Sequence, residues 1–300
     1  MIQATNTLND HQLREAKALI AICQKYDGTF RDPYLSNMLN FDPDMPAFFL
    51  YYEKGELVGL LTVYADDPDV EVAILVHPSH RRQGIARALY RSFETETASY
   101  PIESVTFQTE RVFLERHPEF ASNWGLVEDE ETETWLGRDR TPYELDPRSD
   151  VEVRLAEPSY LEAIARLHHQ TFSDEMESQE VSQRYISEAL KDPDSLLYIL
   201  LKDGQVIGVC TVDVSGTSNY LYGLAVVEDY RGKGYGSYLA KSLVNQLIEQ
   251  NDKEFQIAVE DSNVGAKRLY EKIGFVKQTQ AVYLKPKSRN RKEMKRVKNL

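Results

Sequence analysis

Apolar and polar positions predict an ordered series of helices and strands in the second half of the chain. Apolar residues recur at spacings of three and four within residues 234–250, which is typical of one buried helix face. Short runs rich in β-branched and aromatic residues, separated by turn dipeptides, predict strands at 196–202, 206–214, 219–227 and 254–259, with two last strands at 274–285. Further helices are predicted at 159–172, at the residues leading to Lys191, and at 263–273.

The first half of the chain repeats this order of elements. Residues 51–93 and 199–243 each contain two apolar strands joined by a tight turn, then a third strand and a glycine loop. Arg81 corresponds to Arg231 at an offset of 150 residues. A repeat of this length indicates a duplicated domain rather than a solenoid of short repeats.

A segment rich in Pro, Asp and Arg at 138–150 breaks the periodicity between the two copies and is typical of a linker. The chain of 300 residues suits two domains of about 150 residues each. We therefore expect an N-terminal domain at 1–140, a linker at 141–150, a C-terminal domain at 151–286 and a basic tail at 287–300.

The net charge of −13 is concentrated in the first 150 residues, which hold 14 basic and 27 acidic side chains. An acidic body argues against general nucleic-acid binding and attracts cationic substrates such as amines. The stretch 285–300 holds eight basic residues and one acidic one. It is typical of a solvated chain end, and contact with an anionic partner is the alternative.

The longest apolar runs are far shorter than a membrane span, and the N-terminus lacks the features of a secretory signal, so we expect a cytoplasmic protein without a membrane partner. The two cysteines, Cys23 and Cys210, are far apart and lack metal-ligand spacing. We expect no metal site.

The glycine loop "YRGKGYG" at 230–236 matches neither common nucleotide-binding motif. The dinucleotide fingerprint requires a third glycine where Ser237 stands, and the P-loop requires Ser or Thr after its lysine, where Gly234 stands. A tight turn that needs glycine is one interpretation. However, the loop lies between a predicted strand and the start of a long helix, where free backbone N–H groups form an anion site able to hold a pyrophosphate.

At these residues the sequence resembles the GNAT superfamily of acetyl-CoA-dependent N-acetyltransferases. Arg231, Gly234 and Gly236 have the spacing of the first family signature, and Asn263, Ala266 and Tyr270 have that of the second. The resemblance spans about residues 151–285. It implies an α+β fold with two tandem GNAT-like domains, each a mixed, mostly antiparallel sheet flanked by helices.

The resemblance also implies a function: transfer of an acetyl group from acetyl-CoA to a primary amine, by direct attack in a ternary complex. Tyr270 is then the general acid that protonates the leaving thiolate, while a buried core tyrosine is the alternative reading of this residue. The residues implied to bind the cofactor are Leu224, Ala225, Val226, Arg231, Gly232, Lys233, Gly234, Tyr235, Gly236 and Asn263. We expect a small-molecule or peptide amine as acceptor.

The first half keeps only the first signature. A second cofactor site would comprise Leu75, Val76, Arg81, Arg82, Gln83, Gly84, Ile85 and Ala86. Leu114 and Ala121 stand at the positions of Asn263 and Tyr270, and His117-Pro118 interrupts the corresponding helix. We therefore expect this domain to be degenerate, holding either a CoA or no ligand.

The sequence does not assign the general base to one residue, because the strand "SNYLYGLAV" lacks the carboxylate that many family members place there. Candidates are Asp213, Glu260, Asp261 or a water chain, and Glu175 and Glu177 are candidates for recognising a cationic substrate. The alternative function is a non-catalytic acyl-CoA-binding sensor or scaffold.

Overall fold

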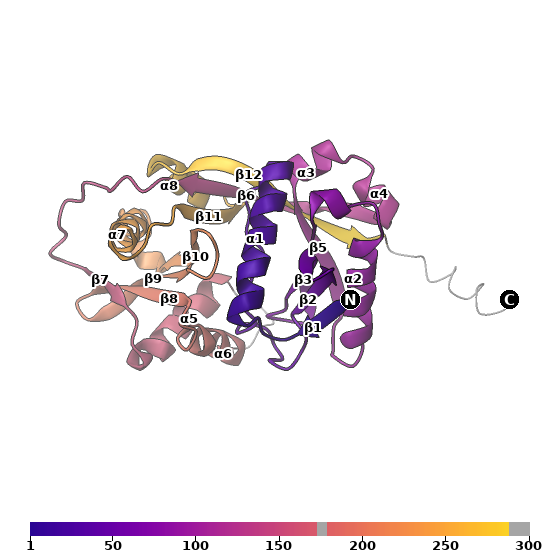
Figure 1. The fold of residues 1–300 in the computed structure, drawn as a ribbon. Coiled ribbons are helices and arrows are strands. Elements are labelled where there is room, and N and C mark those ends of the chain that lie inside the picture. Colours follow the sequence, from indigo (N-terminus) through magenta and orange to yellow (C-terminus); the bar gives the residue numbers. More distant parts are fainter. Residues whose placement is uncertain (173–178, 288–300) are drawn as a thin grey trace.

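The computed structural model describes residues 1–172 and 179–287. In this part of the chain two lobes lie side by side, and one sheet of twelve strands runs through both (Figure 1). None of the described helices is long and apolar enough to cross a membrane. Glu175, Glu177 and the tail beyond residue 287 lie outside the described residues.

The first half folds in the order predicted by its apolar pattern. Asn9 caps the N-terminus of helix α1 (Asp10–Asp27), because its side chain accepts hydrogen bonds from the His11 and Gln12 backbone N–H groups. Gly28 caps the C-terminus of the helix. The remaining strands and helices are β1 (Ile2–Thr5), β2 (Phe48–Glu53), β3 (Glu56–Tyr64), β4 (Asp69–Val76), α2 (Ile85–Glu96), β5 (Ser104–Glu110), α3 (Arg111–Arg116), α4 (Phe120–Trp124) and β6 (Leu126–Arg138).

The second half repeats this order after an irregular segment. Its elements are β7 (Glu152–Leu155), α5 (Leu161–Phe172), α6 (Gln179–Ala189), β8 (Ser195–Lys202), β9 (Gln205–Asp213), β10 (Asn219–Val226), α7 (Tyr235–Gln250), β11 (Phe255–Glu260), α8 (Val264–Lys272) and β12 (Val276–Pro286). The predicted helices and the first four predicted strands are confirmed to within one or two residues at most ends. The helix break expected at His117-Pro118 is confirmed by the separation of α3 from α4.

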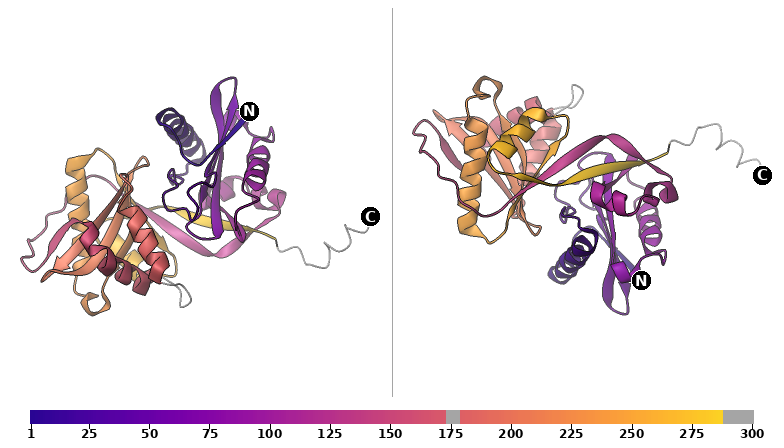
Figure 2. Two further views of the ribbon diagram at one scale, coloured as in Figure 1. Left: turned by 90° about the horizontal axis from the view of Figure 1, so that it is seen from below. Right: turned by 90° about the horizontal axis from the view of Figure 1, so that it is seen from above.

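The two halves exchange their last strands. The strand order is β1-β2-β3-β4-β5-β12-β6-β11-β10-β9-β8-β7, so β12 of the second half pairs with β5, and β6 of the first half pairs with β11. Figure 2 shows β6 and β12 crossing together from one lobe to the other. Only β4 with β5 and β10 with β11 run parallel in the described sheet. The fold is the predicted α+β class, with two copies of a mixed, mostly antiparallel sheet fused into one.

The exchange extends into the two hydrophobic cores. Leu136 on β6 is fully buried in the core of the second half, beneath α7. Val282 and Leu284 on β12 are fully buried in the core of the first half, beneath α2. Each half therefore completes its core with side chains from the other.

The prediction of two last strands at 274–285 is wrong, because this region is the single strand β12. It pairs with β6 from Val276 to Pro286, and register shifts at Lys277/Thr279 and Val282/Leu284 interrupt the ladder. A bulge adds a residue and bends a strand without ending it. The segment therefore spans both lobes rather than folding back as a hairpin.

Candidate active site

The two glycine loops have the same backbone geometry. The Arg81 Nε donates to the Val76 carbonyl at 2.9 Å, and the Arg231 Nε donates to the Val226 carbonyl at 2.8 Å. Gly84 and Gly234, which begin helices α2 and α7, both have φ of +83°. That left-handed conformation favours glycine, and neither helix has a side-chain cap. The first backbone N–H groups of both helices are therefore available to an anion.

Beside each loop, two parallel strands separate. The pairing of β4 with β5 ends at Val72 and Phe107, although both strands continue. The pairing of β10 with β11 ends at Leu221 and Ile257 in the same way. Beyond these points the facing backbone edges are unpaired, which leaves room for an extended ligand to bind between the strands.

The second half has a feature that the first half lacks. The register of β10 against β9 shifts between Tyr222 and Ala225, so Gly223 and Leu224 lie outside the ladder. Gly223 has φ of +60°, which a bulge of this kind requires. In the first half, β4 pairs with β3 in regular register from Glu71 to Val76. Unpaired amides beside an anion site are suited to polarising a carbonyl oxygen.

Tyr270 lies on α8 in the buried core of the second half, together with Cys210 and Leu239. Burial, reinforced by the nearby Cys210, raises the pKa of the Tyr270 phenol well above its ordinary value. The Cys210 thiol in turn contacts the Tyr222 carbonyl, at the start of the bulge. The phenol is therefore protonated at neutral pH and lies in the same core as the bulged strand.

Most of the other predicted residues of the second half are either exposed or buried, while Leu224 and Gly236 are half-buried. Arg231, Gly232, Lys233 and Gly234 are exposed on the loop, while Ala225, Val226 and Tyr235 are buried. The Tyr235 hydroxyl hydrogen-bonds to Asp150, and its ring packs edge-on against Tyr230. The Asn263 side chain caps α8 by accepting from the Ala266 N–H at 3.1 Å, which leaves its amide group as a donor.

Arg148, in the linker, is a loop neighbour that the sequence did not reveal. Its guanidinium stacks 4.1 Å from the Tyr235 ring centroid and donates to the Lys233 carbonyl. Asp150 pairs with the same guanidinium at 3.2 Å. The linker therefore contacts the second glycine loop. Arg148 and Lys233 are 85 residues apart, so the local sequence pattern does not predict this contact.

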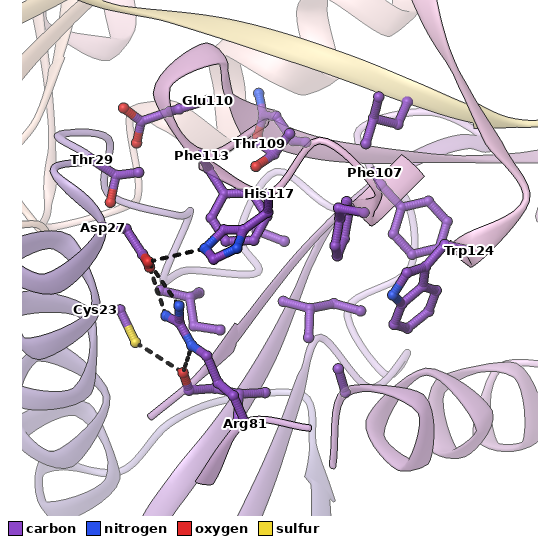
Figure 3. Close-up of a pocket in the computed structure, with 18 of the residues that line it drawn as sticks. Cys23, Asp27, Thr29, Arg81, Phe107, Thr109, Glu110, Phe113, His117 and Trp124 are labelled. Atoms are coloured by element: carbon purple, nitrogen blue, oxygen red, sulfur yellow. Dashed lines mark hydrogen bonds and ion pairs between the residues drawn. The ribbon is translucent and has the colours of Figure 1, made fainter. Parts of the chain in front are cut away.

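The first half contains a cavity of about 790 Å³ at its glycine loop (Figure 3). Seven of the eight residues predicted for a second site line it, namely Leu75, Val76, Arg81, Arg82, Gly84, Ile85 and Ala86. Gln83 is not among the lining residues. Phe107, Phe113 and Trp124 form an aromatic side of this cavity. In this half Leu114 is buried in the core, and Ala121 provides no hydroxyl.

A buried ion pair lies at one end of this cavity. The Arg81 guanidinium donates to both carboxylate oxygens of Asp27, and the His117 ring lies 3.8 Å from the same carboxylate (Figure 3). The Cys23 thiol hydrogen-bonds to the Val76 carbonyl, and burial raises its pKa to about 11. Cys23 is therefore a neutral thiol at physiological pH rather than a nucleophilic thiolate.

The three carboxylates considered as a general base differ in their surroundings. Although burial opposes it, hydrogen bonds from Thr134, Thr132 and other groups keep the pKa of Asp261 below its ordinary value. Asp261 is therefore a poor proton acceptor. Burial raises the pKa of Asp213, which lines a second cavity between the halves. Glu260 is exposed at the end of β11.

Glu71 is a carboxylate that sequence reasoning missed. It lies on β4, two residues before the pairing with β5 is lost, and it lines the same second cavity as Asp213. Burial raises its pKa to about 7, the range suited to a general base. The signal was present in "DVEVAILV", the strand before the first glycine loop, whereas Asp213, Glu260 and Asp261 all lie in the second half.

Separated parallel strands beside a glycine loop at a helix N-terminus suit an extended ligand that carries a pyrophosphate, such as an acyl-CoA. The acetyltransferase (GNAT) family model matches residues 13–120 and 161–275. The chain therefore belongs to the GNAT acetyltransferase family and carries the domain twice, as an acyltransferase of the tandem type.

Known proteins resemble the chain along most of its length. Mycothiol acetyltransferase of Clavibacter sepedonicus is 27% identical over 226 residues, covering 73% of each chain. The crystal structure of a GCN5-related N-acetyltransferase from Sphaerobacter thermophilus superposes with a TM-score of 0.66 at 18% identity, covering 95% of this chain and 94% of that one. A tandem GNAT protein from the clavulanic acid biosynthesis pathway has a TM-score of 0.64 at 15% identity, covering 97% and 100%. The two solved structures establish the fold.

Proposed function

We propose that the second half is the catalytic acetyltransferase and transfers an acetyl group from acetyl-CoA to a primary amine. The observation that carries this proposal is the strand bulge at Gly223, because it adds unpaired amides beside the loop of α7 in the half that holds Tyr270. The names of relatives such as mycothiol acetyltransferase support amine acetylation as the reaction. The first half has neither the bulge nor the tyrosine.

In this proposal each part of the second half has a separate task. The backbone N–H groups at the start of α7 bind the pyrophosphate of acetyl-CoA, with Arg231 and Lys233 adding positive charge. The amides at Gly223 and Leu224 hydrogen-bond to the thioester carbonyl. The amine nitrogen forms its bond to the acetyl carbon as the carbon–sulfur bond breaks. Tyr270 gives its proton to the departing sulfur, and a carboxylate or water takes one from the amine.

The test follows free thiol release from acetyl-CoA with a panel of amines, for the full chain and for Tyr270→Phe. We expect release with at least one amine class and a loss of about 10²-fold or more in kcat for the variant. Tyr198→Phe is the matched control, because Tyr198 on β8 is a fully buried tyrosine in the same core and lines neither cavity. Equal rates for Tyr270→Phe and the intact chain, or no release with any amine, contradict the proposal.

We further propose that the first half binds acyl-CoA without turnover. The supporting observation is its cavity of about 790 Å³ at a loop with the same geometry as that of the second half. Calorimetric titration with acetyl-CoA counts the sites: we expect two per chain, one removed by Gly84→Glu and the other by Gly234→Glu. A single site that is unaffected by Gly84→Glu overturns this second proposal.

A further inference from the structure

A second cavity, of about 270 Å³, lies between the two halves of the chain. Its wall includes Tyr64 and Glu71 of the first half, and Asp213 and Tyr220 of the second. Hydrogen bonds close the junction around it: the Asp32 carboxylate accepts from the Thr217 N–H at 2.6 Å and from its hydroxyl at 2.7 Å. At about 30 Å³ per water molecule, the volume is that of about nine waters, which suits a small molecule.

Aromatic rings form one wall of this cavity. Trp135 on β6 and Tyr220 on β10 project past β11 and stack with ring centroids 4.8 Å apart and an interplanar angle of 4°. Tyr222 continues the stack, with its centroid 5.7 Å from that of Tyr220. Burial raises the pKa of both tyrosines, so the phenols are neutral. The face of a neutral aromatic ring attracts cations.

Carboxylates stand among these rings. Glu71, Glu133 and Asp213 line the cavity together with Arg31, whose positive charge acts on Glu71. Arg31 is itself engaged with the Trp135 ring at 5.3 Å. Within the described residues the Glu71 carboxylate has no hydrogen bond or ion pair. A carboxylate desolvated in this way gains most from a bound cation that donates hydrogen bonds to it.

The cavity reaches both candidate acyl-CoA sites. It shares Arg31, Pro33, Ala73 and Gln108 with the large cavity of the first half. Its aromatic wall ends at Tyr222, directly before the bulge at Gly223 in the second half. A molecule with one end held among the rings and carboxylates therefore has its other end next to the amides proposed to bind the thioester.

We infer that this cavity binds the acetyl acceptor, and that the acceptor is a small organic dication such as a diamine. One ammonium group stays between Glu71 and Glu133 beside the stacked rings, while the second nitrogen, after losing its proton, is acetylated. This inference rests on the proposed function, because it assigns the acceptor of that same reaction. The acidic, aromatic lining disfavours acceptors whose remainder is neutral or anionic.

Binding is tested without turnover by calorimetric titration of the full chain with 1,4-diaminobutane, and with 1,4-butanediol as the neutral analogue. We expect one diamine per chain and no binding of the diol. Glu71→Gln and Glu133→Gln each weaken diamine binding about tenfold or more, while Glu130→Gln, an exposed position on the same strand β6, leaves it unchanged. Equal binding of diamine and diol, no diamine binding, or no effect of either cavity variant overturns the inference.

A turnover assay distinguishes a failure of this inference from a failure of the proposed function. Thiol release is compared for 1,4-diaminobutane, butylamine and a neutral tetrapeptide with a free N-terminus. We expect the diamine to have the highest kcat/KM and Glu133→Gln to raise its KM with little change in kcat. Equal or higher kcat/KM for butylamine or the peptide overturns the inference while supporting the proposed function. No release with any of the three, together with intact diamine binding, contradicts the proposed function alone.

Discussion

The two carboxylate oxygens of Asp27 accept hydrogen bonds from the two terminal nitrogens of the Arg81 guanidinium, with N–O distances of 2.7 and 2.6 Å. This pair ties the end of helix α1 to the first glycine loop. At the matching position of the second half, Arg231 keeps its hydrogen bond to the Val226 carbonyl, but among residues 1–172 and 179–287 it has no ion-pair partner. The duplicated loop is thus held by a buried charge pair in one copy and by backbone contacts in the other.

Arg81→Ala is therefore expected to destabilise the protein much more than Arg231→Ala. Removing Arg81 leaves the buried Asp27 carboxylate without its main partner, at a cost of about 3 kcal/mol in the free energy of unfolding. Arg231 is exposed, and its removal is expected to change stability little. Urea denaturation of both variants measures the difference. Similar midpoints for the two variants contradict the prediction.

Gly59→Ala is expected to destabilise the protein by about 2 kcal/mol. A Cβ at this position on β3 lies 2.8 Å from the Ile85 Cγ2 and 3.1 Å from the Leu89 Cδ1, so these side chains or the helix that carries them must shift. Gly265→Ala is the control, because its Cβ meets nothing closer than 3.8 Å and α8 gains about 0.5 kcal/mol of helix propensity. Thermal unfolding is expected to show opposite shifts in Tm. An unchanged Tm for Gly59→Ala counts against close packing of α2 on β3.

Cutting the linker is expected to leave the two halves associated. The strands β6 and β12 pair along almost their whole length, and each carries core side chains of the other half. A protease site inserted between Glu144 and Pro147 produces two pieces after cleavage. Size-exclusion chromatography is expected to show them eluting together at the mass of the intact chain. Separation without denaturant means that the exchanged strands do not hold the halves together.

Glu71→Gln is expected to stabilise the protein more at pH 8 than at pH 5. Burial raises the folded-state pKa of Glu71 to about 7, and Glu133, Asp66 and Asp67 raise it further against the opposing charge of Arg31. An unfolded glutamate titrates near 4.3, so between these values only the folded state keeps the proton. The contribution of Glu71 to stability is therefore present below the unfolded pKa and is lost as pH rises through the folded pKa.

Glutamine does not titrate, so the variant avoids this loss. We expect an advantage that is about 2 kcal/mol larger at pH 8 than at pH 5, measured by urea denaturation at both pH values. Glu130→Gln, on the exposed part of β6, serves as the control and is expected to show no such pH dependence. An advantage of the same size at both pH values rules out titration of Glu71 as its cause.

The sequence by itself determined the local elements and the duplication. Helix α7 follows from its apolar spacing, and the three strands before it follow from their composition and turns, because these signals depend on neighbours within a few residues. The offset between Arg81 and Arg231 likewise anticipated two loops of the same backbone geometry. The sequence also predicted the missing tyrosine and the broken helix of the first half, because each depends on the residues at one position, Ala121 and His117-Pro118.

The tertiary structure alone decided how the halves combine. Strand β6 contains the acidic run "EDEETET", and this sequence gives no indication of which strands pair with β6. Its pairing with β12 joins residues that are more than 130 positions apart in the chain. Strand pairing is a non-local contact, and register is set by which faces are buried in the assembled sheet. The cavity between the halves has the same origin: Glu71, Trp135 and Tyr220 lie far apart in the sequence and meet only because the exchanged strands bring the two sheets together.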